Sequence, residues 1–132
     1  MTVIAVEDDK VLRFLQILLD PQTPAERMSV FADYVAHDID QQQWLAAARA
    51  QVPAVYPASV RLLKDEADLR AALPEADALV VESMTIGAAE LALTTRLKLI
   101  HKFGTRADNI DLAACAQRGV TVTTQRRRSN FA

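Results

Sequence analysis

The stretch that decides the fold is Leu97 to Ala132, LKLIHKFGTRADNIDLAACAQRGVTVTTQRRRSNFA. Its first part, Leu97–Phe103, is an apolar run typical of a buried strand, and a glycine turn follows it. Ile110–Arg118 then has the composition of a helix closed by Gly119, and Val120–Thr124 is a second strand-like run. A strand, a turn, a helix and a strand in this order are the pieces of a parallel α/β sheet.

The rest of the chain repeats this alternation. Short apolar runs at Val3–Val6, Val60–Leu63 and Ala78–Val81 predict three more strands. Helices are expected at Lys10–Asp20, from Thr23 to about His37, from Asp40 to about Ala48, and at Asp65–Leu73 and Gly87–Leu93. Five strands with helical crossovers predict an α/β fold with a doubly wound, five-stranded parallel sheet.

Capping residues and apolar faces sharpen three of these helices. In the first, the apolar face is predicted to consist of Val11, Phe14, Leu15, Leu18 and Leu19. The second should have Thr23 as its N-cap and Pro24 as its first residue. In the third, Trp44, Leu45 and Ala48 form the predicted packing face.

Composition limits the classes of function. The chain has 132 residues, 51% of them hydrophobic, which is enough for one domain with a core. A net charge of -2 provides no basic field for nucleic acid or an anionic membrane. The single cysteine, Cys115, excludes an internal disulfide, and the opening MTVIAVEDD does not have the pattern of a signal peptide. We therefore expect a soluble cytoplasmic protein that binds neither nucleic acid nor membrane.

Ligands of parallel sheets bind at the carboxyl ends of the strands. Three of the predicted ends carry polar residues, namely Glu7–Asp9, Glu82–Thr85 and Gly104–Asn109. Gly104 lets a ligand approach the backbone closely, so the N–H groups of Phe103 to Thr105 are candidates for holding a substrate carboxylate. The alternative is an ordinary strand-to-helix turn without a ligand.

Acids beside this turn are candidates for helix caps and not for chemistry. Asp108 or Asn109 is expected to cap the following helix, and Asp111 to add a favourable charge near its start. Glu82 and Glu90 are interpreted as a solvated carboxylate and a helix residue, in place of an acid/base pair.

Isolated histidines and the cysteine have structural interpretations. His101 is expected to be packed or paired and not catalytic, and His37 has no partners at metal-ligand spacing, so no metal site is predicted. Cys115, among alanines, is interpreted as a small buried hydrophobe.

The segment LKLIHKFGTRADNIDLAACAQRGVTV, preceded by ADALVVESMTIGAAEL, resembles the amino-terminal part of the D-isomer-specific 2-hydroxyacid dehydrogenases. The resemblance rests on DNID at positions 108–111 and RGV at 118–120, and it extends over about Ala76 to Asn130 and more loosely to the amino terminus. It implies a flavodoxin-like substrate-binding domain, which in this family is interrupted in sequence by a Rossmann cofactor domain.

The resemblance also implies an activity and site residues. The family transfers a hydride reversibly between NAD or NADP and a D-2-hydroxy acid, and its members are commonly homodimers. Phe103 and Gly104, continuing into Thr105, match the turn whose backbone amides hold the substrate carboxylate, and Asn130 matches an asparagine near the substrate. The family usually has a second glycine where this chain has Arg106, and Arg126–Arg128 replace a Pro-Gly type loop.

Several parts of such an enzyme have no match in this sequence. The only glycines are Gly87, Gly104 and Gly119, so no G-x-G-x-x-G dinucleotide motif occurs. The resemblance places the catalytic arginine, glutamate and histidine further along, so no catalytic residue is assigned here. We expect residues 1–132 to be the amino-terminal part of the substrate-binding domain, without the NAD-binding domain, inactive alone and with apolar surface uncovered. Poor solubility or association would follow.

Two other classes of protein match parts of the sequence. A phosphoacceptor receiver would hold Mg²⁺ with Asp8 and Asp9, but Glu82 stands at the phosphoacceptor position and no lysine follows the fifth strand. A stand-alone binding module would use Arg126–Arg128 with Phe131 on a single-stranded nucleic acid, against the acidic balance of the chain.

Overall fold

The computed structural model describes residues 1–34, 41–51 and 55–125, which contain a five-stranded, all-parallel sheet. The strands are β1 (Thr2–Glu7), β2 (Ala58–Leu63), β3 (Ala78–Val81), β4 (Leu99–Lys102) and β5 (Thr121–Thr124). They lie in the order β2-β1-β3-β4-β5. The chain therefore winds in one direction to β2 and in the other from β3 onward, which confirms the predicted doubly wound parallel sheet.

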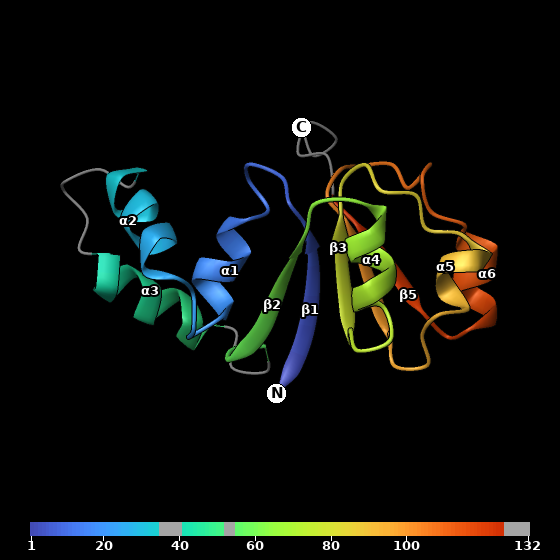
Figure 1. Ribbon diagram of the computed structural model, residues 1–132, viewed down its shortest axis with the longest axis horizontal. Helices are drawn as coiled ribbons and strands as arrows, with labels where there is room; N and C mark the ends of the chain where they lie inside the picture. Colours follow the sequence, from blue (N-terminus) through green and yellow to red (C-terminus); the bar gives the residue numbers. More distant parts are fainter. Residues whose placement is uncertain (35–40, 52–54, 126–132) are drawn as a thin grey trace, which may run out of the picture.

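Helices lie on both sides of this sheet (Figure 1). α1 (Phe14–Leu19), α2 (Ala25–Tyr34) and α3 (Gln41–Ala50) are on one side, and α4 (Glu66–Ala72), α5 (Ala88–Leu91) and α6 (Leu112–Gln117) are on the other. Each strand and helix that the sequence predicts is present. The described part of α2 ends at Tyr34, so the predicted end near His37 lies outside the described residues.

Alternate residues of the central strands enter two different cores. Ala5, Leu79 and Ile100 face the side of α4, α5 and α6, where they are at most 1% exposed. Ile4 and Val6 face the other side and pack with Leu12 and Leu19. This alternation follows from the two-residue period of a strand, with apolar residues on both faces because helices pack on each side of the sheet.

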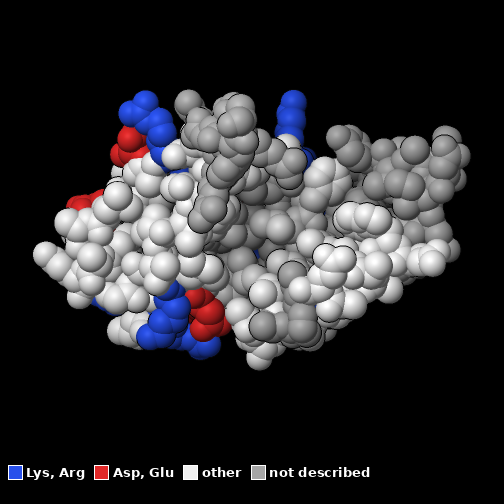
Figure 2. Space-filling view, turned by 180° about the vertical axis from the view of Figure 1, so that it is seen from behind, with Lys and Arg blue, Asp and Glu red and all other residues white. Residues whose placement is uncertain are grey.

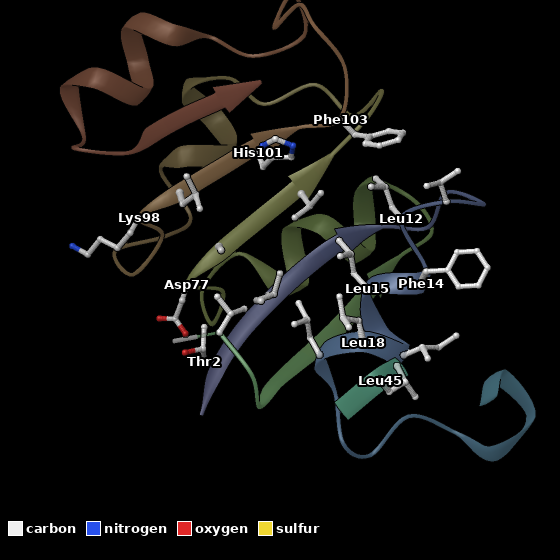
Figure 3. A pocket seen from close by; sticks show the side chains of 18 of the residues that line it. Thr2, Leu12, Phe14, Leu15, Leu18, Leu45, Asp77, Lys98, His101 and Phe103 are labelled. Atoms are coloured by element: carbon white, nitrogen blue, oxygen red, sulfur yellow. The ribbon is translucent and has the colours of Figure 1, made fainter. Parts of the chain in front are cut away.

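The second face is covered only in part. α1 packs against β2 and β1, whereas the same face of β3 and β4 borders an apolar groove of about 870 Å³. Figure 3 shows His101 of β4 and Phe103, just after this strand, directed into the groove opposite Leu12 and Leu15. Charged side chains gather mainly at the margins of the face in Figure 2. Among the described residues, the lining of this groove is mainly apolar.

The segment before α1 differs from its prediction. Asp9 Oδ1 accepts hydrogen bonds from the N–H groups of Val11 (2.8 Å) and Leu12 (3.3 Å), which makes a turn of Lys10–Arg13 and delays the α-helix to Phe14. Leu12 is consequently buried and Val11 is 55% exposed, so assigning Val11 to the apolar face was wrong.

Helices α2 and α3 also correct details of the prediction. Thr23 Oγ1 donates to the carbonyls of Gln16 and Asp20, both at 2.7 Å, and α2 begins at Ala25, so Thr23 is not its N-cap. On α3, Leu45 is buried as predicted, but Trp44 is 45% exposed and does not belong to the packing face.

Arg49 anchors α3 to α1. Its Nε and Nη2 donate to the carbonyls of Leu18 and Ile17, each at 2.8 Å, and its guanidinium lies 4.6 Å from the centre of the Tyr56 ring. These carbonyls are at the end of α1, where backbone acceptors lose their helical partners. The arginine therefore supplies donors that the short helix lacks.

Cys115 and His101, which lie on opposite faces of the sheet, have the structural roles that the sequence predicts. Cys115 is 1% exposed, and burial, together with the nearby charge of Asp111, raises the pKa of its thiol. His101 Nδ1 lies 2.7 Å from Thr123 Oγ1 on the neighbouring strand, so His101 is paired as expected.

Candidate functional site

A cavity of about 400 Å³ lies at the carboxyl ends of β3 and β4. It is lined by Glu82, Ser83, Lys102, Phe103, Gly104, Thr105, Arg106, Asp108 and Asn109. Three of the four predicted site residues, Phe103, Gly104 and Thr105, are thus together in one cavity. The fourth, Asn130, lies outside the described residues, as do Arg126–Arg128 and Phe131.

The turn after β4 leaves backbone donors available. The N–H of Phe103 donates to the carbonyl of Val81 at 2.7 Å, and the carbonyl of Gly104 accepts from the N–H of Gln125 at 2.8 Å. Within the described part of the chain, no group accepts a hydrogen bond from the N–H of Gly104 or of Thr105. Two consecutive N–H groups without a partner, on residues that line a cavity, are an arrangement suited to an anion.

Backbone conformation explains the glycine at this turn. Gly104 has φ +152°, a value that side-chain-bearing residues rarely adopt. A Cβ at this position would lie an ordinary 3.5 Å from Lys102 Cε, so conformation and not space requires the glycine.

Arg106 replaces the family's second glycine without an unusual backbone. In the described part of the chain, only glycines have a positive φ. Arg106 is a described residue, so its φ is not positive. Its Nε pairs with Asp108 Oδ2 at 3.1 Å, and both side chains are about three-quarters exposed. The charge of Arg106 is therefore balanced at the rim of the cavity.

Lys102 brings a positive charge to the cavity wall. Its ammonium group donates to the carbonyl of Glu82 across the strand ends. Among the described carboxylates, none forms an ion pair with Lys102. Its charge is thus available to an anion beside the free N–H groups of Gly104 and Thr105.

Glu7 holds the opposite wall of the cavity. At the end of β1 it is 8% exposed, and its carboxylate accepts hydrogen bonds from the N–H groups of Glu82 (3.2 Å), Ser83 (3.0 Å) and Met84 (2.7 Å) and from Ser83 Oγ (2.9 Å). Burial, the largest single influence, would raise the pKa of Glu7, but these hydrogen bonds together lower it below its usual 4.5.

Asn109 joins that wall to the turn. Its Nδ2 donates to the carbonyls of Met84 at 2.6 Å and Glu82 at 3.4 Å. The helix cap is instead Asp111, whose Oδ1 accepts from the N–H of Ala114 at 3.0 Å, so the predicted cap at Asp108 or Asn109 was wrong. An amide side chain that donates to two carbonyls of another loop acts as a cross-link between the two segments.

The other acids of the strand ends have local roles. Asp8 pairs with Arg13 at 3.1 Å, and Asp9 closes the turn before α1. Glu90 Oε1 accepts from the N–H of Gly87 at 2.7 Å and so caps its own helix. In the described residues no group of three or more His, Cys, Asp or Glu side chains is arranged to hold a metal ion.

The glycines do not form a dinucleotide-binding turn. Gly87 is the N-cap of α5, and Gly119, with φ +71°, closes α6 through the hydrogen bond from Val120 N to the carbonyl of Cys115 at 2.9 Å. Only Gly104 lies in a turn after a strand, so these residues do not fit the pyrophosphate of a dinucleotide. Over the described residues, no helix combines the length and apolarity needed to cross a membrane.

Comparison with known proteins agrees with this fold. The sequence pattern of the D-isomer specific 2-hydroxyacid dehydrogenase catalytic domain matches residues 34–129, which is most of the chain. The chain belongs to this family, which confirms the resemblance seen in the sequence.

Individual relatives extend the comparison. D-3-phosphoglycerate dehydrogenase of Mycobacterium leprae is 48% identical over 59 residues, which are 44% of this chain and 11% of that protein. The structure of a Pyrococcus horikoshii OT3 protein matches 95% of this chain and 28% of its own, with TM-score 0.58 and 17% identity. NAD⁺-bound 3-phosphoglycerate dehydrogenase of Entamoeba histolytica matches 94% of this chain and 33% of its own, with TM-score 0.55 and 16% identity. The chain therefore spans a minor part of each relative.

Proposed function

We propose that this chain provides the substrate-carboxylate-binding part of an NAD-dependent D-2-hydroxyacid dehydrogenase. The observation that carries the proposal is the pair of unpartnered N–H groups at Gly104 and Thr105, which line a cavity beside the ammonium group of Lys102. Backbone N–H groups and a lysine together favour a carboxylate over a neutral group.

The proposed substrate is a 2-hydroxy acid with a second anionic group, such as 3-phospho-D-glycerate. The curated relative from Mycobacterium leprae is a D-3-phosphoglycerate dehydrogenase. Lys102 offers a charge that no described carboxylate neutralises, and a doubly anionic acid uses such a charge better than a singly charged one.

The other parts of the proposed enzyme, including its dinucleotide-binding domain, would lie outside the cavity at the ends of β3 and β4. Residues 1–132 would form the amino-terminal part of the substrate-binding domain, with a separate domain binding the dinucleotide and Asn130 approaching the substrate. NAD is favoured over NADP because a related solved structure holds NAD⁺. A homodimer and a cytoplasmic location complete the proposal, and the buried free thiol of Cys115 suits a reducing compartment.

Calorimetric titration of the 132-residue chain tests this proposal. We expect 3-phospho-D-glycerate to bind about tenfold more tightly than D-glycerate, a difference of about 1.4 kcal/mol. Lys102→Ala should remove most of this preference because it removes the charge at the cavity wall. Lys98→Ala is the matched control, since Lys98 borders the apolar groove instead.

Titration with neutral D-glyceramide distinguishes binding of the carboxylate from nonspecific binding. The amide has nearly the shape of D-glycerate but no carboxylate, so it should not bind measurably. Equal binding of the amide and the acid, or an undiminished preference in Lys102→Ala, would contradict the proposed site.

A further inference from the structure

Glu7 occupies a point on which several donors converge. Three consecutive N–H groups, those of Glu82, Ser83 and Met84, and the hydroxyl of Ser83 all donate to its carboxylate. Consecutive N–H groups that point to one place form a natural anion site. Here the chain's own carboxylate fills that site, so these amides are not open to a ligand.

The loop held by Glu7 is a wall of the acid-binding cavity. Glu82 and Ser83 line the cavity directly. The same loop receives the side chain of Asn109, which donates to the carbonyls of Met84 and Glu82, and the ammonium group of Lys102, which donates to the carbonyl of Glu82. Glu7 thus fixes the N–H side of the loop, while the cavity's own residues bind its carbonyl side.

Asn109 connects the Glu82–Met84 loop to the turn after β4. It ends the segment that begins at Gly104, and its own carbonyl accepts from the N–H of Ile86 at 2.9 Å. The bridge between Ile86 and Ile110 adds a second connection between the two segments. A displacement of Glu82–Met84 therefore moves the acceptors of both Asn109 and Lys102, which flank the free amides of Gly104 and Thr105.

We propose that Glu7 is a positioning residue of the acid-binding cavity: its buried carboxylate fixes the Glu82–Met84 loop and, through Asn109 and Lys102, the spacing between the turn amides and the lysine charge. This inference rests on the proposed function for the identity of the ligand. Glu7 does not touch the acid. A neutral or shorter side chain leaves N–H groups of the loop unsatisfied, and the cavity wall relaxes.

The test compares Glu7→Gln with wild type by ¹H–¹⁵N NMR and by D-glycerate titration. Glutamine keeps the shape but places an NH₂ donor against the loop N–H groups. We expect shifts in the Asn109 side-chain amide and in the Gly104 and Thr105 backbone amides, and an affinity for D-glycerate about fivefold or more below wild type. Asp8→Asn is the matched control, because Asp8 is the next residue and contacts Arg13 but not the loop.

Ser83→Ala keeps the test decisive if Glu7→Gln does not fold. It removes only the hydroxyl donor and should produce the same pattern of shifts at smaller amplitude. The inference is overturned if either folded variant shifts only Ser83 and Met84 while the Asn109 and Gly104 resonances stay as in wild type. Failure of the wild-type chain to bind D-glycerate would refute the proposed function, and the resonance pattern would still decide the role of Glu7.

Discussion

Gly104 illustrates what one residue decides in this site. Its φ of +152° shapes the turn after β4, in which the N–H groups of Gly104 and Thr105 have no partner among the described residues. The sequence predicts the importance of Gly104 because glycine after an apolar strand is a recognisable signal. Glu7 is different: its partners lie 75 to 77 residues away, so no local pattern indicates that this acid is buried.

We predict that Gly104→Ala destabilises the fold by about 1–3 kcal/mol, because alanine pays the conformational cost of this backbone. The free energy of unfolding is measured by urea denaturation. Thr105→Ala is the control: it lies in the same turn at a negative φ and should change stability by less than about 0.5 kcal/mol. Equal effects of the two substitutions would show that the backbone of Gly104 is not special.

The strands and helices are those that the sequence predicts, but several helices begin at a different residue. The predicted strand Ala78–Val81 has the observed bounds, because a buried strand is marked by its own apolar run. Helix α6 begins at Leu112, two residues after the predicted start, because three polar side chains precede it and each is a plausible cap. Tertiary contacts make the choice: Asn109 binds the Met84 carbonyl, and Asp111 is left to cap the helix.

The identity of this cap is testable. Asp111→Ala should lower the free energy of unfolding by about 1 kcal/mol, the usual cost of losing an N-cap side chain. Asp108→Ala should have little effect, because among the described residues Asp108 pairs with Arg106, and both side chains are largely exposed. Chemical denaturation of both variants measures the difference. A larger loss for Asp108→Ala would return the cap to the position predicted from the sequence.

At the scale of the whole molecule, the order of strands and helices determines where a ligand can bind. The sheet places the turn after β4 beside the loop after β3, and both lie at the carboxyl edge, as the alternation of elements predicts. The predicted turn is therefore found in a cavity. Among the described residues, the face of β3 and β4 that is turned away from α4, α5 and α6 borders an apolar groove beside the core formed by α1, β1 and β2.

The fold and the position of the Gly104 turn in a cavity could be predicted because their signals are local. The contributions of Glu7, Asn109 and Lys102 could not, because they depend on which loops the sheet brings together. The family pattern suggests the ligand class, and the structure adds that the N–H groups of Gly104 and Thr105 have no partner among the described residues.

The most direct test of the central claim is a ¹H–¹⁵N NMR titration of the wild-type chain with D-glycerate and, separately, with NADH. The account predicts saturable shifts at the Gly104 and Thr105 amides with D-glycerate, in the millimolar range expected of about 4 kcal/mol of binding free energy. NADH should give no saturable shift. Saturable binding of NADH, or D-glycerate shifts that leave Gly104 and Thr105 unchanged, would contradict it.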